Sequence, residues 1–469
     1  MIFIFGGLAA VSSYDRFKRA KNDKERRGST RLCILGLTIV AFALPWALLG
    51  PGGTSNLVAS QWSDISNEYF GAAYQVEDAR AFSREYSTRW QKPQSVLQAH
   101  TATHPPGAVL FYYGARRAYE ASLFLQSSFS GIAASLTNES VETLANQSNQ
   151  LRASAERSAG VKIPDVALPV SAVGAAIWCA FLISLLLASC IPATYFIASI
   201  AHAGSTSDAN DARGMTAAAL LALAPVISLF AFSLDAIVAG GAAWTMAFIA
   251  LRLRGGKSFW LPAAGVMMAL TSFVSFGALA IAAIAIIALL VAKKRAAITE
   301  TALFLAGFVA TWLVLILVFP MQPLEIFRNA MAAHRFATVE SRSHSSWLLM
   351  NIVSYAVFCG WPLFLAACLG GVRFLLGLKR DKFDIGATAS TPVIIGVAAL
   401  LTMLLLTLSG GAKGEVERLW LFLTPSLAAL AAAILMQRSG WQSIGVLLLL
   451  QAAQTIIMAA WLAPLVLPL

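Results

Sequence analysis

The residues that follow the first hydrophobic stretch, 51–168 (the first loop), include side chains that can accept protons. Four of its carboxylates fall within fifteen residues: Asp64, Glu68, Glu77 and Asp78. A carboxylate at a membrane surface can serve as a general base toward the hydroxyl of a sugar or a lipid. The same spacing also suits a solvated acidic helix, since residues four apart share one helix face. Spacing alone does not separate these two interpretations.

The first loop contains a rigid element, His104-Pro105-Pro106-Gly107. Two prolines fix an extended chain, and the glycine then releases it into an amphipathic stretch that carries Tyr112. An imidazole held there can donate to a phosphate or hold an acceptor, so we assign His104 and Tyr112 to substrate binding. The alternative is a structural turn in which the imidazole only caps a neighbouring backbone group.

Two later loops are rich in cations. The second loop, residues 320–347, carries Arg328, His334, Arg335, Arg342 and His344; the third loop, residues 409–425, carries Lys413, Glu415, Glu417 and Arg418. A mixed set of arginine and histidine suits a phosphate headgroup, because guanidinium donates in a fork. We assign substrate binding to His334, Arg342, Lys413, Glu417 and Arg418. The alternative is interfacial anchoring.

Charges this close to hydrocarbon are costly unless they are paired or used. Arg418 is therefore expected to pair with a carboxylate. All five cysteines fall inside apolar runs, so the sequence predicts no disulfide and no cysteine-built metal site.

Long apolar segments must position these loops. Apolar residues make up 58% of the chain and charged residues only 12%, and the mean hydropathy is +0.71. A soluble protein needs about twice that share of charge, so lipid must solvate much of this exterior. The apolar runs lack period-2 alternation, which indicates an all-α, polytopic membrane bundle. We predict eleven spans, near 32–50, 169–191, 215–233, 236–252, 259–275, 277–293, 301–320, 351–376, 391–409, 419–436 and 441–466.

The charge distribution orients this single membrane domain. Nearly all of the net charge of +11 lies on one side of the predicted spans, in the segment 14–31 and in the short loops at 252–257, 293–295 and 379–382. Positive flanks stay in the cytoplasm, so the N-terminus is cytoplasmic and the three loops face outward. The excess charge then needs no nucleic-acid partner. A span at 107–126 would invert this arrangement, so residues 51–168 are read as an extracytoplasmic region with interfacial helices.

Together, the acidic first loop, the THPPG element (103–107) and GEVERLW (414–420) resemble the lipid-linked-sugar glycosyltransferases of the GT-C fold class. The nearest branches are the bacterial relatives of dolichyl-phosphate-mannose protein mannosyltransferases and the lipid A aminoarabinose transferases. The resemblance covers most of the chain in topology. At residue level it covers 62–113, 334–361 and 411–425.

The resemblance implies transfer of a sugar from a polyprenyl-phosphate donor to a protein, lipid or polysaccharide acceptor. It implies that an acidic residue of the first loop acts as a base or orients the acceptor, and Glu68 and Asp78 are the candidates. The usual adjacent Asp-Glu pair is Asn67-Glu68 here, which leaves that choice open. Some relatives use a divalent metal; without the paired motif we predict neither a metal nor another cofactor.

Two other functions stay open. A lipid flippase or transporter is one, although the predicted spans hold almost no ionisable residue in their central portions, where cargo and ions usually bind. A scaffold for envelope polysaccharide synthesis is the other. The alanine-rich spans suit a bacterial inner membrane.

Overall fold

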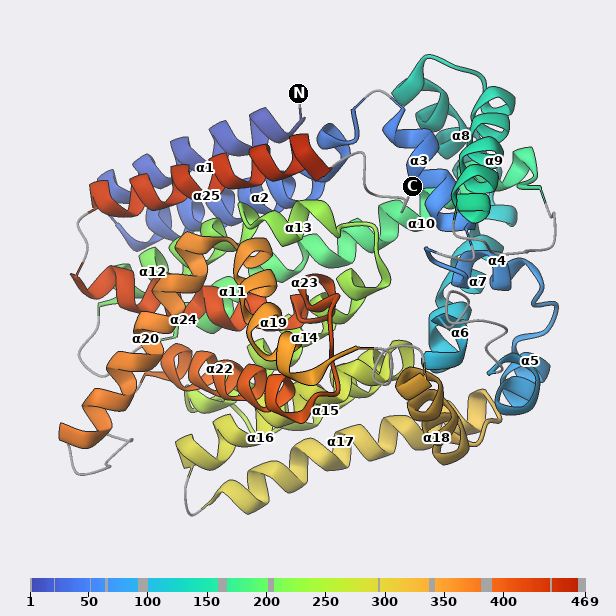
Figure 1. Ribbon diagram of the computed structural model, residues 1–469. Helices are drawn as coiled ribbons and strands as arrows, with labels where there is room; N and C mark the ends of the chain where they lie inside the picture. Colours follow the sequence, from blue (N-terminus) through green and yellow to red (C-terminus); the bar gives the residue numbers. More distant parts are fainter. Residues whose placement is uncertain are drawn as a thin grey trace.

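The computed structural model describes residues 2–20, 22–50, 52–63, 66–91, 100–158, 167–200, 206–293, 296–336, 342–380, 390–438 and 441–462. Throughout these residues the secondary structure is helical, with no β-strand, so the expected all-α class is confirmed. Figure 1 shows long helices packed side by side, with a cluster of shorter helices at one end.

Seven helical segments are long and apolar enough to cross a membrane, which supports a multi-pass integral membrane protein. They are α2 (Asp23–Leu48), α10 with α11 (Val170–Ala188, Cys190–Ala198), α14 (Leu234–Leu253), α17 (Ala297–Val318), α22 (Thr391–Ser409), α23 with η6 and α24 (Val416–Leu419, Leu421–Leu423, Thr424–Arg438) and α25 (Trp441–Leu462). A bent pair, α19 (His344–Cys359) and α20 (Trp361–Arg380), makes an eighth when it is counted as one span.

The predicted count of eleven is not reached by this criterion, and the reason is that the remaining segments are short or interrupted. The predicted span 215–233 is split into α12 (Ser207–Ala222) and α13 (Pro225–Leu229). The spans 259–275 and 277–293 correspond to α15 (Trp260–Val274) and to η3 with α16 (Phe276–Leu279, Ala280–Lys293), which are apolar but shorter.

The N-terminal residues form α1 (Ile2–Arg19), which packs along α2. Gly6 lies so close to Gly36 that a Cβ added to it would come within 3.0 Å of the Gly36 carbonyl oxygen. Small residues at such crossings let two helices approach closely in a membrane. Helix α1 therefore packs against part of the first span.

The last helix, α25, completes the hydrogen bonding of two interrupted helices. At the bend between α19 and α20, Gly360 has φ +94°, and the amide groups of Gln451 and Gln454 replace the missing helical bonds. Gln451 donates to the Cys359 carbonyl (3.0 Å), and Gln454 donates to Val357 (2.8 Å) while accepting from the Trp361 N–H (3.0 Å). Because Gln451 is fully buried, these bonds satisfy backbone groups that water cannot reach.

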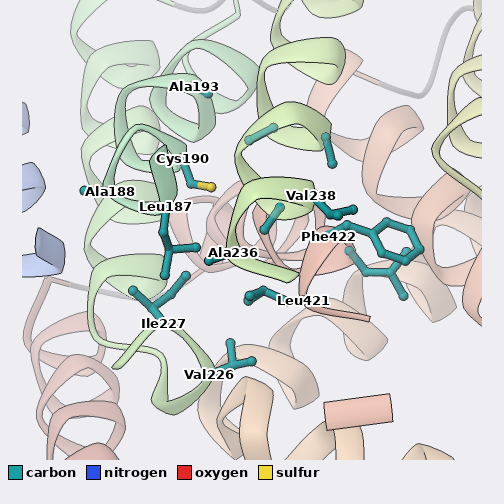
Figure 2. Close-up of a cluster of buried hydrophobic side chains, with 14 of the residues drawn as sticks. Leu187, Ala188, Cys190, Ala193, Val226, Ile227, Ala236, Val238, Leu421 and Phe422 are labelled. Carbon is teal, nitrogen blue, oxygen red and sulfur yellow. The ribbon is translucent and has the colours of Figure 1, made fainter. Parts of the chain in front are cut away.

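Thr455, one turn beyond Gln451 on α25, makes the corresponding bond at the second break. Its hydroxyl donates to the Leu223 carbonyl (2.6 Å), where α12 ends before Pro225. The helix pieces on either side of this break pack into the apolar core. Figure 2 shows part of that core, where residues of α10, α11, α13, α14 and η6 meet.

The residues of the first loop form a cap at one end of the bundle, which we call the capped end. Its helices are α3 (Gly53–Trp62), α4 (Tyr69–Tyr74), α5 (Ala79–Glu85), the π-helical turn η1 (Tyr86–Trp90), α6 (His100–Thr103), α7 (Gly107–Glu120), α8 (Leu123–Thr137) and α9 (Val141–Ser158). Helix α18 (Pro323–His334) of the second loop packs against α6, and these helices gather on the right of Figure 1. Helix α7 is anchored through Gly107, where an added Cβ would lie 2.1 Å from the Phe273 carbonyl oxygen at the end of α15.

Candidate functional site

The three loops meet at the capped end. Gln91 of the first loop donates to the Ile326 carbonyl of α18 (3.0 Å), and Asn329 of α18 donates back to the Ser87 carbonyl (3.1 Å). His334 of the second loop lies 2.6 Å from the Gly411 carbonyl oxygen of the third loop, measured from Nε2. The second loop therefore contacts both the first loop and the third loop.

Glu68 occupies a fixed position just before α4. Its backbone has φ +50°, which is unusual for a residue with a side chain. The carboxylate accepts a hydrogen bond from the Thr101 N–H (3.0 Å) and another from the Thr101 hydroxyl. Two such bonds fix the orientation of a carboxylate. The side chain is half-buried, so Glu68 is a held carboxylate and not part of a freely solvated acidic helix.

His104 lies beside Glu68's neighbour Tyr69. The imidazole Nδ1 is 2.9 Å from the Tyr69 hydroxyl and 3.0 Å from the His100 carbonyl oxygen. A carbonyl only accepts, so we infer that Nδ1 carries the hydrogen and that Nε2 is an acceptor. Burial, then the charge of His100, and more weakly those of Arg418 and His334, lower the pKa of His104 to about 3. A neutral imidazole of this kind suits the binding of a hydroxyl better than donation to a phosphate.

Tyr112 is fully buried behind this pair. Its hydroxyl accepts a hydrogen bond from the Asn67 amide (3.1 Å), and its ring stacks on Tyr69 with centroids 6.3 Å apart. Burial raises the pKa of Tyr112 well above its ordinary value. Tyr112 therefore packs against the ring of Tyr69, and it would contribute to substrate binding only indirectly.

The third loop is a tight turn held by Asn351 of α19. The Asn351 amide donates to the Ala412 carbonyl (2.7 Å) and its oxygen accepts from the Gly414 N–H (3.1 Å). Gly414 has φ +89°, and a Cβ added there would lie 2.3 Å from the Arg342 guanidinium. The glycine is needed for both reasons: it gives the backbone its left-handed conformation and leaves room for the arginine.

Arg418 pairs with two carboxylates, which confirms the expected pairing. Its Nη2 lies 2.5 Å from Glu415 Oε2, and its Nη1 lies 3.5 Å from Asp235 Oδ2 in the first turn of α14. Arg342 approaches the other oxygen of Glu415 at 3.7 Å. Lys413 donates to the Arg342 carbonyl (2.9 Å). These five side chains and the Arg342 backbone form one connected charged cluster.

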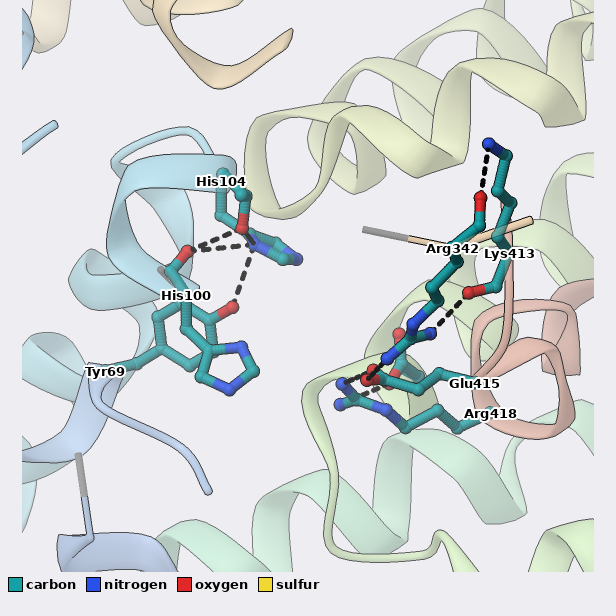
Figure 3. Close-up of polar contacts among 9 residues, drawn as sticks. Tyr69, His100, His104, Arg342, Lys413, Glu415 and Arg418 are labelled. Atoms are coloured by element: carbon teal, nitrogen blue, oxygen red, sulfur yellow. Dashed lines mark hydrogen bonds and ion pairs between the residues drawn. The ribbon is translucent and has the colours of Figure 1, made fainter. Parts of the chain in front are cut away.

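The histidine pair and this charged cluster face each other. Figure 3 shows the imidazoles of His100 and His104 on the side of α6 that looks toward Glu415 and Arg418. The pKa of Glu415 is lowered: burial opposes its ionisation, but Arg418, then His100 and Arg342, outweigh burial. First-loop and third-loop residues therefore face the same space.

Two of the predicted residues make their described contacts outside the charged cluster. Asp78 is exposed and caps α5, accepting from the Ala81 N–H (2.6 Å), and the contacts of the described residues do not link it to the charged cluster. Glu417 accepts a hydrogen bond from Ser354 of α19 (3.0 Å), which places it on the α19 side of the third loop. Asp64 lies outside the described residues.

Sequence analysis did not assign His100, Tyr69, Asp235 or Glu415 to the site. The spacing of His100 and His104, four residues apart, was the available signal for the first of these. Asp235 was visible as a carboxylate at the turn before a predicted span, a costly position unless the charge is paired. Glu415 and Arg418 are three residues apart, which on a helical turn places them side by side.

Within the described part of the chain, no group of three or more His, Cys, Asp or Glu side chains is arranged to hold a metal ion. Comparison of the sequence and the structure with protein-family models, curated proteins and solved structures finds no match.

Proposed function

We propose that this protein is a membrane glycosyltransferase of the GT-C type, which moves a sugar from a polyprenyl-phosphate donor to an acceptor hydroxyl at the capped end. One observation carries the proposal: His100 and His104 face the cluster that holds Arg342, Lys413 and Arg418, and Glu68 is hydrogen-bonded to Thr101 of α6, the short helix that begins at His100. A base on one side and cations on the other are what displacement of a phosphate from a sugar requires.

Glu68 is the general base in this reaction, and Asp78 is the weaker candidate because it caps a helix in solvent. The acceptor oxygen forms a bond to the anomeric carbon while the bond from that carbon to the phosphate oxygen breaks. The acceptor's proton passes to Glu68, and the electron pair of the broken bond leaves with polyprenyl phosphate. Displacement in one step inverts the anomeric configuration.

The cations stabilise the leaving group, on which negative charge develops. Arg342 and Arg418 are the direct candidates, with Lys413 and His334 at the edge of the cluster. A hydroxyl of the donor sugar, not the reacting hydroxyl, donates to Nε2 of His104, which holds the sugar near Glu68. The acceptor is a protein, a lipid or a polysaccharide, and the proposed chemistry uses no cofactor.

We further propose the topology in which the capped end faces outward and the N-terminus is cytoplasmic. The basic loops at 252–257 and 379–382 belong to the opposite side of the predicted spans, as the positive-inside rule requires. In this arrangement all eleven predicted segments cross or enter the bilayer. The helices that are shorter than a full span do so in pairs. The bacterial inner membrane fits the alanine-rich spans and a polyprenyl donor.

Purified protein in proteoliposomes tests the assignment, with a polyprenyl-phosphate sugar as donor. Glu68→Gln should bind the donor as tightly as the wild type and lower sugar transfer by about 100-fold or more, the usual effect of losing a general base. Asp78→Asn is the matched control, since asparagine caps a helix as well as aspartate does. Equal transfer by wild type and Glu68→Gln would rule out the assignment of the base.

The second candidate is a lipid flippase or transporter, and the two interrupted helices favour it. Carriers bind cargo at broken helices near the membrane centre. Here, however, backbone groups at both breaks bond to α25 through Gln451, Gln454 and Thr455. A carrier would move a fluorescent polyprenyl phosphate across the bilayer equally well as wild type and as Glu68→Gln, without forming a product.

A further inference from the structure

Glu415 bridges two guanidinium groups that come from different loops. One carboxylate oxygen lies 2.5 Å from Arg418 Nη2 and the other lies 3.7 Å from Arg342 Nη2. Two guanidiniums at this separation repel each other unless an anion lies between them. A carboxylate and a phosphate both present two oxygens to such forks, so the Glu415 side chain occupies the position that a phosphate would take.

Arg418 does not depend on Glu415 alone. Its second partner, Asp235, lies in the first turn of α14 with its side chain only 12% exposed, whereas the Glu415 side chain is 42% exposed. When Glu415 turns toward solvent, Arg418 therefore keeps one carboxylate. Two guanidiniums then face a single carboxylate, so the site gains a net positive charge, to which Lys413 adds.

The backbone around Glu415 allows this side-chain movement without unfolding the loop. Glu415 has φ +57°, a left-handed conformation that costs a non-glycine residue on the order of 1 kcal/mol, and it precedes the single-turn helix α23. Asn351 holds Ala412 and Gly414 in place from α19. Only the carboxylate has to move, and it moves from a partly exposed position into water.

We propose that Glu415 is an internal anion that occupies a phosphate site formed by Arg342 and Arg418, and that it must be displaced before a phosphate group binds there. Glu415 thereby sets the affinity and offsets the repulsion between the two arginines when no ligand is bound. The inference rests on the proposed function for its ligand, a phosphate carried by a lipid or free in solution. The binding event itself needs no sugar transfer.

The test measures binding of farnesyl phosphate to the full-length protein in detergent micelles, with farnesol and inorganic phosphate as further probes. Glu415→Gln keeps the size of the side chain and removes its charge. It should lower the Kd for farnesyl phosphate by about tenfold. This factor corresponds to a phosphate site that Glu415 leaves open in about one wild-type molecule in ten. Farnesol binding should not change, and Arg342→Gln should weaken farnesyl phosphate binding.

Glu325→Gln is the matched control, because it removes one negative charge from α18 at the same end of the protein. Tighter binding by Glu415→Gln alone supports the proposal, and the probe that responds more strongly, farnesyl phosphate or inorganic phosphate, identifies the source of the phosphate. Unchanged or weaker binding of both probes overturns it. Glu415→Asp, whose carboxylate is too short to bridge both arginines, should give an intermediate Kd and serves if the glutamine variant is unstable. Because this experiment measures binding and not sugar transfer, its result can be interpreted even if the transferase assignment fails.

Discussion

The guanidinium Nη1 of Arg418 lies 3.5 Å from Oδ2 of Asp235, although the two residues are 183 positions apart in the chain. This contact joins the third loop to the first turn of α14. The same turn region is tied to the first loop, because the Gln61 amide donates to the Phe232 carbonyl (3.1 Å). Arg418 therefore connects the charged cluster to the first turn of α14.

Arg418→Gln should destabilise the protein and abolish its activity together. Loss of the cation leaves Asp235 buried without its partner, which costs on the order of 3 kcal/mol in the free energy of unfolding. Sugar transfer should fall by about 100-fold, the effect of removing one group that stabilises a developing anion. Unfolding in mixed micelles and a transfer assay measure the two effects.

Arg328→Gln is the control for this prediction, because Arg328 is an exposed arginine of the second loop. It should leave both quantities unchanged. The double variant Asp235→Asn with Arg418→Gln should recover part of the stability, but not the transfer activity. A full recovery of sugar transfer would show that Arg418 has no role in the reaction itself.

The stability of the protein should fall as the pH drops below about 6.5, partly through His104. The pKa of His104 is lowered to about 3 in the folded protein, so the unfolded chain binds a proton first. The stability contributed by the neutral ring is present above pH 6.5 and is lost progressively between pH 6.5 and 3, at no more than about 1.4 kcal/mol per pH unit. The ring keeps some exposure to solvent, which makes the slope shallower than this limit.

His104→Gln has no proton to gain, so its unfolding free energy should depend less on pH between 7 and 5. His344→Gln, which removes an exposed histidine of the second loop, should keep the wild-type slope. Chemical unfolding at a series of pH values measures both. The same slope in His104→Gln as in the wild type would contradict the buried, neutral state of this imidazole.

The sequence predicts the uniform helices well and the interrupted ones poorly. Residues 391–409 were predicted as a span and form α22 with the same bounds, because nothing in that run breaks an apolar helix. The predicted span 351–376 is instead bent by 119° between α19 and α20. Average hydropathy contains no information about the positive φ of Gly360. The hydrogen bonds that the bend leaves open are completed by glutamines about ninety residues away, which a local pattern cannot predict.

The site shows the same division between local and distant information. The types of residue were predictable, since acidic, histidine-containing and basic loops all fall on one side of the predicted topology. The residues with which they pair were not predictable. That Arg418 needs a carboxylate follows from the cost of a charge near hydrocarbon, but the choice of Asp235 depends on how α14 packs in three dimensions.

Gly360→Ala should be strongly destabilising. A Cβ at this position would lie 2.1 Å from Nε2 of Gln451, and the backbone has φ +94°. Backbone strain alone costs on the order of 2 kcal/mol, and the displaced amide would lose its bond to the Cys359 carbonyl. Gly377→Ala in α20 is the control, because an added Cβ meets nothing within 4 Å there and alanine favours the helix by up to about 1 kcal/mol. Equal unfolding temperatures for the two variants would contradict the described joint between α19 and α25.

The release of polyprenyl phosphate from a polyprenyl-phosphate sugar is the most direct measurement of the central claim. Purified wild-type protein in proteoliposomes, given donor and an acceptor mixture, should release the lipid phosphate in step with glycosylated product. Asp78→Asn should do so at a similar rate, whereas Glu68→Gln should release about 100-fold less. If Glu68→Gln releases the lipid phosphate as fast as the wild type, or if the wild type releases none from any such donor, the account of this site as a sugar-transfer centre is wrong.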